Sequence, residues 1–224
     1  MPRFLGNKLC AVRVKRERRK EARPGELIEA ALALFVEKGF AATRSEEVAV
    51  RAGVSKGTLF LYFPTKEDLL KAVIAENLAG RFSEWNAEFD TFEGSTADML
   101  RHCMAVWWER VGSTPAAGLT KLMLSEGNNF PELAAFYRQQ VVEPGHALMR
   151  RILRRGIDSG EFIPVDVDHA LYAVVGPLIM LTLITHASST CVDSQITIDP
   201  RKYLSVQIEL VIRGLAVATA GPAT

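Results

Sequence analysis

Residues 43–66, TRSEEVAVRAGVSKGTLFLYFPTK, decide the fold because they encode two short helices that meet at a glycine. Thr43 and Glu46 have the spacing of a capping box, which predicts the start of the first helix. Gly53 is expected to end that helix, since glycine adopts a left-handed backbone at little cost. Ser55 then predicts the cap of the second helix.

The second helix is expected to leave apolar side chains in water. Leu59 and Phe63 are four residues apart and predict its buried side, so that Phe60 and Leu61 face outward beside a lysine and a glycine. A helix-turn-helix explains this exposure, because its second helix lies in the major groove, where apolar groups contact thymine methyls. The stretch therefore predicts a DNA-binding helix-turn-helix.

At this point the sequence resembles the TetR/AcrR family of transcriptional regulators. The resemblance rests on Gly39-Phe40, Thr43, Val48-Ala49, residues 52–63 (AGVSKGTLFLYF) and residues 66–69 (KEDL). It implies a homodimeric repressor that binds a palindromic operator in double-stranded DNA and is released by a small-molecule effector. Residues 122–144 resemble, more loosely, the C-terminal domain of AcrR- and AefR-like members. Ser45 and Phe60 depart from the family pattern, and Phe60 in place of the common tyrosine removes a hydroxyl contact to phosphate.

Candidate DNA contacts follow from the outward face of the second helix. A lysine can donate to guanine or phosphate, a glycine lets the backbone approach closely, and hydroxyl groups can bind phosphate. The predicted DNA-binding residues are Arg44, Ser55, Lys56, Gly57, Thr58, Phe60, Leu61, Tyr62 and Lys66. Lys66 is predicted to clamp a phosphate, because a cation in a first helical turn opposes the helix dipole. The alternative is a solvated side chain.

Charge is concentrated at the start of the chain. Residues 1–23 carry nine Lys or Arg against two Glu, a charge of +7, whereas the whole chain of 224 residues carries +1. This segment is predicted to be a basic, disordered N-terminal arm. It either tracks the DNA backbone or minor groove, or is only a solvated extension.

Hydrophobic periodicity is helical throughout, which predicts an all-α chain of about nine helices. We expect a three-helix DNA-binding domain over residues 24–70 and a larger helical domain for effector binding and dimerisation over residues 71–220. Three widely spaced cysteines favour a reducing, cytoplasmic location. Residues 171–187 approach the length of a membrane span, but Gly176-Pro177 interrupts them and acids flank them. A buried helix at a subunit interface is therefore expected, with no membrane contact.

The larger domain contains soft, apolar side chains that predict an effector pocket. Its predicted residues are His102, Cys103, Met104, Trp107, Leu122, Met123, Phe136 and Tyr137. The alternative is that they only fill a core. No charged residue falls on these stripes, so we expect a flat or aromatic, uncharged effector. The last two helices, residues 168–187 and 201–217, are too apolar for a water-facing surface and predict a two-fold dimer.

Two other classes of function compete with a regulator. The four histidines are scattered, with no zinc-protease motif, nucleophile elbow or phosphate-binding loop, so no enzyme, metal or cofactor is expected. An architectural DNA-binding protein would not need the large apolar helical domain. A ligand-responsive regulator accounts for both parts of the chain.

Overall fold

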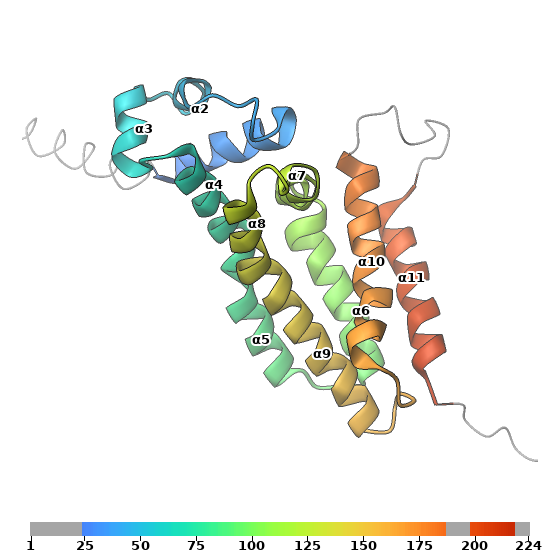
Figure 1. Ribbon diagram of the computed structural model, residues 1–224. Helices are drawn as coiled ribbons and strands as arrows, with labels where there is room; N and C mark the ends of the chain where they lie inside the picture. Colours follow the sequence, from blue (N-terminus) through green and yellow to red (C-terminus); the bar gives the residue numbers. More distant parts are fainter. Residues whose placement is uncertain (1–23, 187–197, 218–224) are drawn as a thin grey trace, which may run out of the picture. The chain divides into compact units, whose positions relative to one another are not determined.

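The computed structural model describes residues 24–186 and 198–217 (Figure 1). The predicted basic arm, residues 1–23, lies outside them. The described residues form nine successive helical runs and contain no strand, which confirms the all-α prediction. The chain divides into two compact units, residues 1–73 and 74–224. The division falls three residues beyond the expected one, because residues 71–73 still group with the first unit.

The first unit contains a helix over residues 24–38, followed by α2 (Ser45–Arg51), α3 (Lys56–Tyr62) and most of α4 (Lys66–Ile74). Leu27, Phe35, Phe40, Val48 and Leu59 are completely buried. The rings of Phe35 and Phe40 lie 5.4 Å apart and pack at a tilt. This small core fixes the first helix, α2 and α3 against one another.

The predicted capping box is shifted by one residue. Arg44 is the N-cap of α2, and its N–H donates to the Glu47 carboxylate at 3.1 Å. Thr43 is buried instead, and its hydroxyl donates to the carbonyl of Gly39 at 2.7 Å. The prediction of Thr43 as a cap is therefore wrong. Its hydroxyl is needed at the end of the preceding helix, which leaves unpaired carbonyls.

The second unit, over residues 74–186 and 198–217, is a bundle of seven further α-helices with short π- and 3₁₀-helical turns. Its α-helices are α5 (Arg81–Thr91), α6 (Thr96–Trp107), α7 (Gly118–Glu126), α8 (Pro131–Tyr137), α9 (Glu143–Asp158), α10 (Val167–His186) and α11 (Pro200–Leu215). Within this unit α6 packs between α9 and α11, and α10 packs against α7, α9 and α11 (Figure 1). The core lies among these helices.

Three π-helical turns interrupt the long helices: Ala75–Ala79 between α4 and α5, Trp108–Gly112 after α6, and Arg138–Val142 between α8 and α9. The helical run that begins at Lys66 continues through the first of these turns to Thr91. Pro144 lies in the first turn of α9, directly after the third. Proline removes a helical hydrogen bond, and the wider turn before it accommodates that loss.

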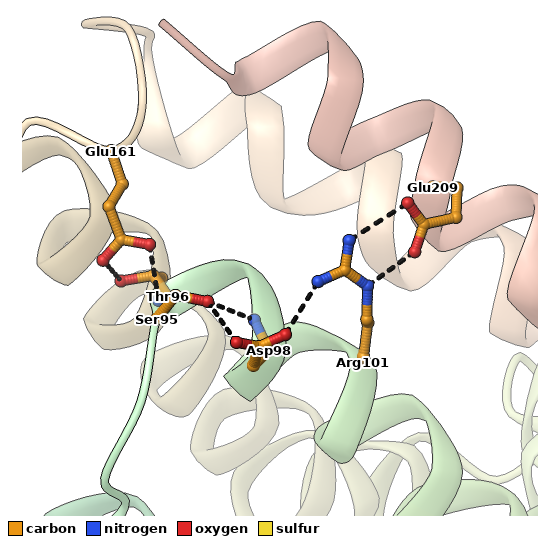
Figure 2. A network of polar contacts seen from close by, with 6 residues as sticks. All are labelled: Ser95, Thr96, Asp98, Arg101, Glu161 and Glu209. Atoms are coloured by element: carbon orange, nitrogen blue, oxygen red, sulfur yellow. Dashed lines mark hydrogen bonds and ion pairs between the residues drawn. The ribbon is translucent and has the colours of Figure 1, made fainter.

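A polar network joins the start of α6 to α11 and to the loop after α9 (Figure 2). The Glu161 carboxylate accepts from the N–H and the hydroxyl of Thr96, at 2.7 and 2.9 Å. Arg101 donates to both Glu209 oxygens, at 2.6 and 3.1 Å, and to Asp98. Burial raises the pKa of Glu161, but its hydrogen bonds together outweigh burial and lower the pKa below the ordinary value.

Candidate nucleic-acid interface and ligand cavity

The turn between α2 and α3 has the predicted backbone. Gly53 adopts a φ of 66°, in the left-handed region, and its N–H donates to the carbonyl of Val50. Ser55 caps α3, since its hydroxyl accepts from the N–H of Thr58 at 3.1 Å. The Thr58 hydroxyl also lies 2.9 Å from that of Ser55. Both hydroxyls therefore help to fix the start of α3.

The outward face of α3 is apolar and basic. Leu61 is 77% exposed and Phe60 37% exposed, whereas Leu59 is buried. The Lys56 ammonium forms an ion pair with Glu46 of α2 and lies 5.6 Å from the centre of the Phe60 ring. The pKa of Glu46 is lowered, chiefly by the hydrogen bond from Lys56. A cation beside exposed apolar groups suits a DNA groove.

The remaining predicted contacts lie close to this face. Arg44 is exposed at the start of α2, Gly57 is exposed in the first turn of α3, and Tyr62 is half-buried in its last turn. A Cβ added at Gly57 would meet only the Ser55 hydroxyl, at 3.8 Å, so no packing inside the unit requires glycine there. Sequence reasoning missed Val50 of α2, which is 79% exposed.

The structure gives Lys66 a different role from the predicted phosphate clamp. Its ammonium donates to the carbonyls of Phe40, Ala41 and Thr43, at 2.8, 3.4 and 3.0 Å, and lies 4.4 Å from the centre of the Phe40 ring. These contacts use its three donors and explain a cation in the first turn of α4. The helix dipole therefore no longer argues for a phosphate contact, because the ammonium of Lys66 is bound inside the first unit.

The second unit contains a partly open cavity of about 450 Å³, within the range of small-molecule sites. Six of the eight predicted pocket residues line it: His102, Cys103, Met104, Trp107, Met123 and Tyr137. Leu122 and Phe136 do not. Leu122 is buried in the core, and Phe136 is partly buried outside the cavity wall. Leu122 and Phe136 directly precede Met123 and Tyr137, and successive side chains of a helix point in different directions.

The sequence analysis did not predict one wall of the cavity. Four aromatic side chains from α5 and from the residue that ends it line the cavity, at spacings of three, four and three residues: Phe82, Trp85, Phe89 and Phe92. That spacing places the four aromatic rings on one face of a helix and could have been detected in the sequence. Further lining residues come from α9 and α10, among them Met149, Ile152, Val175, Leu178 and Ile179.

The cavity wall also contains charged groups, so the premise of an uncharged lining is wrong. Glu88 and Arg138 both line it. The Glu88 carboxylate accepts from Arg110 at 2.7 Å and lies 3.7 Å from the Nε2 atom of His102. Arg138 is paired with Glu143 at 2.7 Å. These charges were missed because periodicity places them at the margins of the apolar stripes.

The cavity has no evident nucleophile. Burial, with the nearby charge of Glu88 adding to it, raises the pKa of the Cys103 thiol to about 11, so the thiol stays protonated at neutral pH. The Tyr137 hydroxyl is 2.8 Å from that of Thr120. In the described part of the chain, no group of three or more His, Cys, Asp or Glu could hold a metal ion.

Comparison with known proteins decides the family. Residues 27–73 match the family model of bacterial regulatory proteins of the tetR family, and residues 92–194 match a tetracyclin repressor-like C-terminal domain. The fatty acid metabolism regulator protein of Bacillus subtilis is 34% identical over 167 residues, which cover 71% of this chain and 82% of that protein. The chain belongs to the TetR family.

Solved structures of TetR-family proteins share the fold. The fatty acid degradation regulator FadR of Bacillus halodurans superposes with a TM-score of 0.69 at 22% identity, covering 85% of this chain and 94% of that one. FadR of Bacillus subtilis, solved in complex with stearoyl-CoA, gives a TM-score of 0.61 at 22% identity and covers 84% and 97%. Membership of the TetR family, rather than this shared fold, shows that the chain is a DNA-binding transcriptional regulator and not an enzyme.

Proposed function

We propose that this regulator is a cytoplasmic repressor that a small, largely apolar effector releases from its operator. The observation that carries this proposal is the cavity of about 450 Å³ with aromatic and sulfur side chains in its wall. Such walls can repack around a ligand, whereas an architectural DNA-binding protein needs no cavity. The stearoyl-CoA bound by the Bacillus subtilis protein supports an effector with a long apolar part.

We place operator recognition on the exposed face of α3. Lys56 would donate to a guanine edge or a phosphate, and Gly57 would allow close approach of the backbone. Phe60 and Leu61 would contact thymine methyls and read groove shape. Arg44, Ser55, Thr58 and Tyr62 would contact phosphates around this face. Lys66 is left out because its donors are used inside the unit.

A second copy of the chain is the proposed partner of α10 and α11. By length and composition α10 could cross a membrane, and only 28% of its most apolar window is buried within the described protomer. Its outward side exposes Tyr172 and Met180, and that of α11 exposes Val206 and Leu210. Two-fold pairing would cover these side chains and bring two recognition helices to a palindromic operator.

The dimer is tested on the outward side of α10 and α11. Met180→Glu or Leu210→Glu is expected to give monomers, as measured by light scattering, because these side chains are 52% and 59% exposed. The buried Leu181 is a poor target, because a charge there would disrupt the protomer's own core. Dimers of unchanged stability from both variants would show that the partner surface lies elsewhere.

Release of the operator is proposed to start in the cavity wall. Residues 66–91 run from the first unit into the second, and their later part supplies Phe82 and Trp85 to the cavity. An effector that favours a different position of this segment would oppose DNA binding. A coupling of about 1–3 kcal/mol is enough for a 5–150-fold loss of operator affinity.

Two neighbouring tryptophans, Trp107 at the end of α6 and Trp108 at the start of the π turn that follows, provide a matched test. Trp107 lines the cavity, whereas Trp108 is also partly buried against the core but does not line it. The duplex protected upstream of the chain's own gene would be titrated with each variant, with and without apolar compounds. Trp107→Ala should bind DNA and lose or change its response, while Trp108→Ala should respond as the native chain does. An unchanged response in Trp107→Ala would contradict the proposed site.

A further inference from the structure

The cavity of the second unit is much longer than it is wide. Its wall extends from Leu78 to Phe92 on one side and from Arg138 to Ile152 on another. At a helical rise of about 1.5 Å per residue each stretch is about 20 Å long, whereas a sphere of 450 Å³ is only about 10 Å across. The shape therefore suits an extended molecule better than a compact one.

Contacts between the two stretches show that they run side by side in the same direction. At one end, the π turns Ala75–Ala79 and Arg138–Val142 pack against each other. Toward the other end, the guanidinium carbon of Arg151 lies 4.2 Å from the centre of the Phe89 ring. The helices α5 and α9 are neighbours over this length (Figure 1). A molecule that fills the cavity thus lies lengthwise along them.

The two ends of the cavity differ in charge. Arg138 lies at one end, and Glu88 lies toward the other. Glu88 shares Arg110 with Glu84, so two carboxylates face one guanidinium there. The Arg138 side chain is 61% exposed and paired with Glu143, which does not line the cavity. An exposed ion pair is weak, so Arg138 can exchange Glu143 for another anion at little cost.

We propose that the effector is a single-chain carboxylate, with its alkyl chain extended along α5 and α9 and its carboxylate bound by Arg138. The proposal rests on the proposed function and names the class of effector. A guanidinium group matches a carboxylate through two parallel hydrogen bonds. In the described wall Arg138 is the only Lys or Arg, which suits one negative charge rather than the several phosphate charges of a coenzyme A ester.

The shape of the cavity is tested with two isomers of equal charge, hexadecanoate and 2-hexyldecanoate. A C–C bond of about 1.5 Å at a tetrahedral angle advances an extended chain by about 1.25 Å per carbon, so hexadecanoate spans about 20 Å. With its carboxylate at one end, the branched isomer places two shorter chains side by side. Dissociation constants, measured below micelle formation by displacement of the neutral dye Nile red, should be about tenfold lower for hexadecanoate.

The headgroup is tested with dodecanoate and 1-dodecanol, which share one chain. The native protein should bind the carboxylate about fivefold more tightly at low salt. Arg138→Gln should abolish this preference, whereas Glu143→Gln frees Arg138 and should increase it. Arg154 is exposed on α9 and does not line the cavity, so Arg154→Gln is the matched control and should keep the native preference.

The outcomes separate this inference from the proposed function. Equal affinity of the native protein for dodecanoate and 1-dodecanol, or a preference that persists in Arg138→Gln, overturns the role of Arg138 but leaves the effector cavity standing. Equal or tighter binding of 2-hexyldecanoate overturns the extended chain, and tighter binding of hexadecanoyl-CoA than of hexadecanoate overturns the free carboxylate. Uptake of neither Nile red nor any of these ligands overturns the cavity as an effector site together with the inference. The comparisons on the native protein decide the matter even if a variant does not fold.

Discussion

The ion pair between Lys56 and Glu46 should restrain DNA binding. Lys56 lies on the face of α3 proposed to enter the groove, yet its ammonium is paired with a carboxylate of α2 in the free protein. To bind guanine or phosphate, Lys56 must leave Glu46. Glu46→Gln removes this competitor and also a negative charge next to the DNA. The variant should therefore bind DNA more tightly.

The size of the effect follows from the exposure of the pair. The two side chains are 56% and 54% exposed, so their mutual attraction is weak and the gain should be about two- to fivefold in the dissociation constant. A lysine that is free to neutralise one phosphate adds about 0.9 to the slope of log affinity against log salt. A dimer with two such lysines would gain up to about 1.8.

Fluorescence anisotropy with the protected duplex, repeated at several salt concentrations, measures both quantities. Glu37→Gln is the matched control, because it removes the same charge from an ion pair with Arg51 whose side chains are 59% and 48% exposed. That pair is outside α3, so its loss should leave the DNA affinity and its salt dependence nearly unchanged. Weaker binding by Glu46→Gln, or an equal gain in the control, would refute the placement of Lys56 in the interface.

Three further predictions concern the stability of the fold, each measured by urea unfolding. Gly156→Ala should lower the free energy of unfolding by about 1–2 kcal/mol, because its Cβ would lie 2.1 Å from the ring of the buried Phe162. The same change at Gly214, where no atom lies within 4 Å, should be neutral or stabilising, and equal effects would contradict the argument. The lowered pKa of Glu161 means that its contribution is present above the unfolded value of 4.5 and is lost as the pH falls through the folded pKa. The stability cost of Glu161→Gln should thus be larger at pH 7 than at pH 3, and an equal cost at both would count against it. Lys66→Met should lower the free energy of unfolding by about 1–3 kcal/mol, because it removes the donor to the carbonyls of Phe40 and Thr43. Weaker DNA binding with unchanged stability would instead support the predicted phosphate contact of Lys66.

The sequence alone determined the helix-turn-helix and the all-α class. Gly53, the Ser55 cap and the buried Leu59 are local features, because caps, turns and helical periodicity depend on residues only a few positions apart. The exposed Phe60 and Leu61 follow from the same period. Most of the predicted pocket could be inferred as well, since large, soft side chains at helical spacing point to one face.

Only the tertiary structure decided how distant residues share their polar groups. Thr43 and Lys66 were given local roles, by capping-box spacing and by the helix dipole, but both donate to carbonyls just after the first helix. Residues 168–187 were predicted to contact a second copy because they are apolar all round, and periodicity cannot tell the buried side of α10, which carries Leu181, from the exposed side, which carries Met180. Hydrogen bonding and burial are set by neighbours in space, which the order of residues along one helix does not specify.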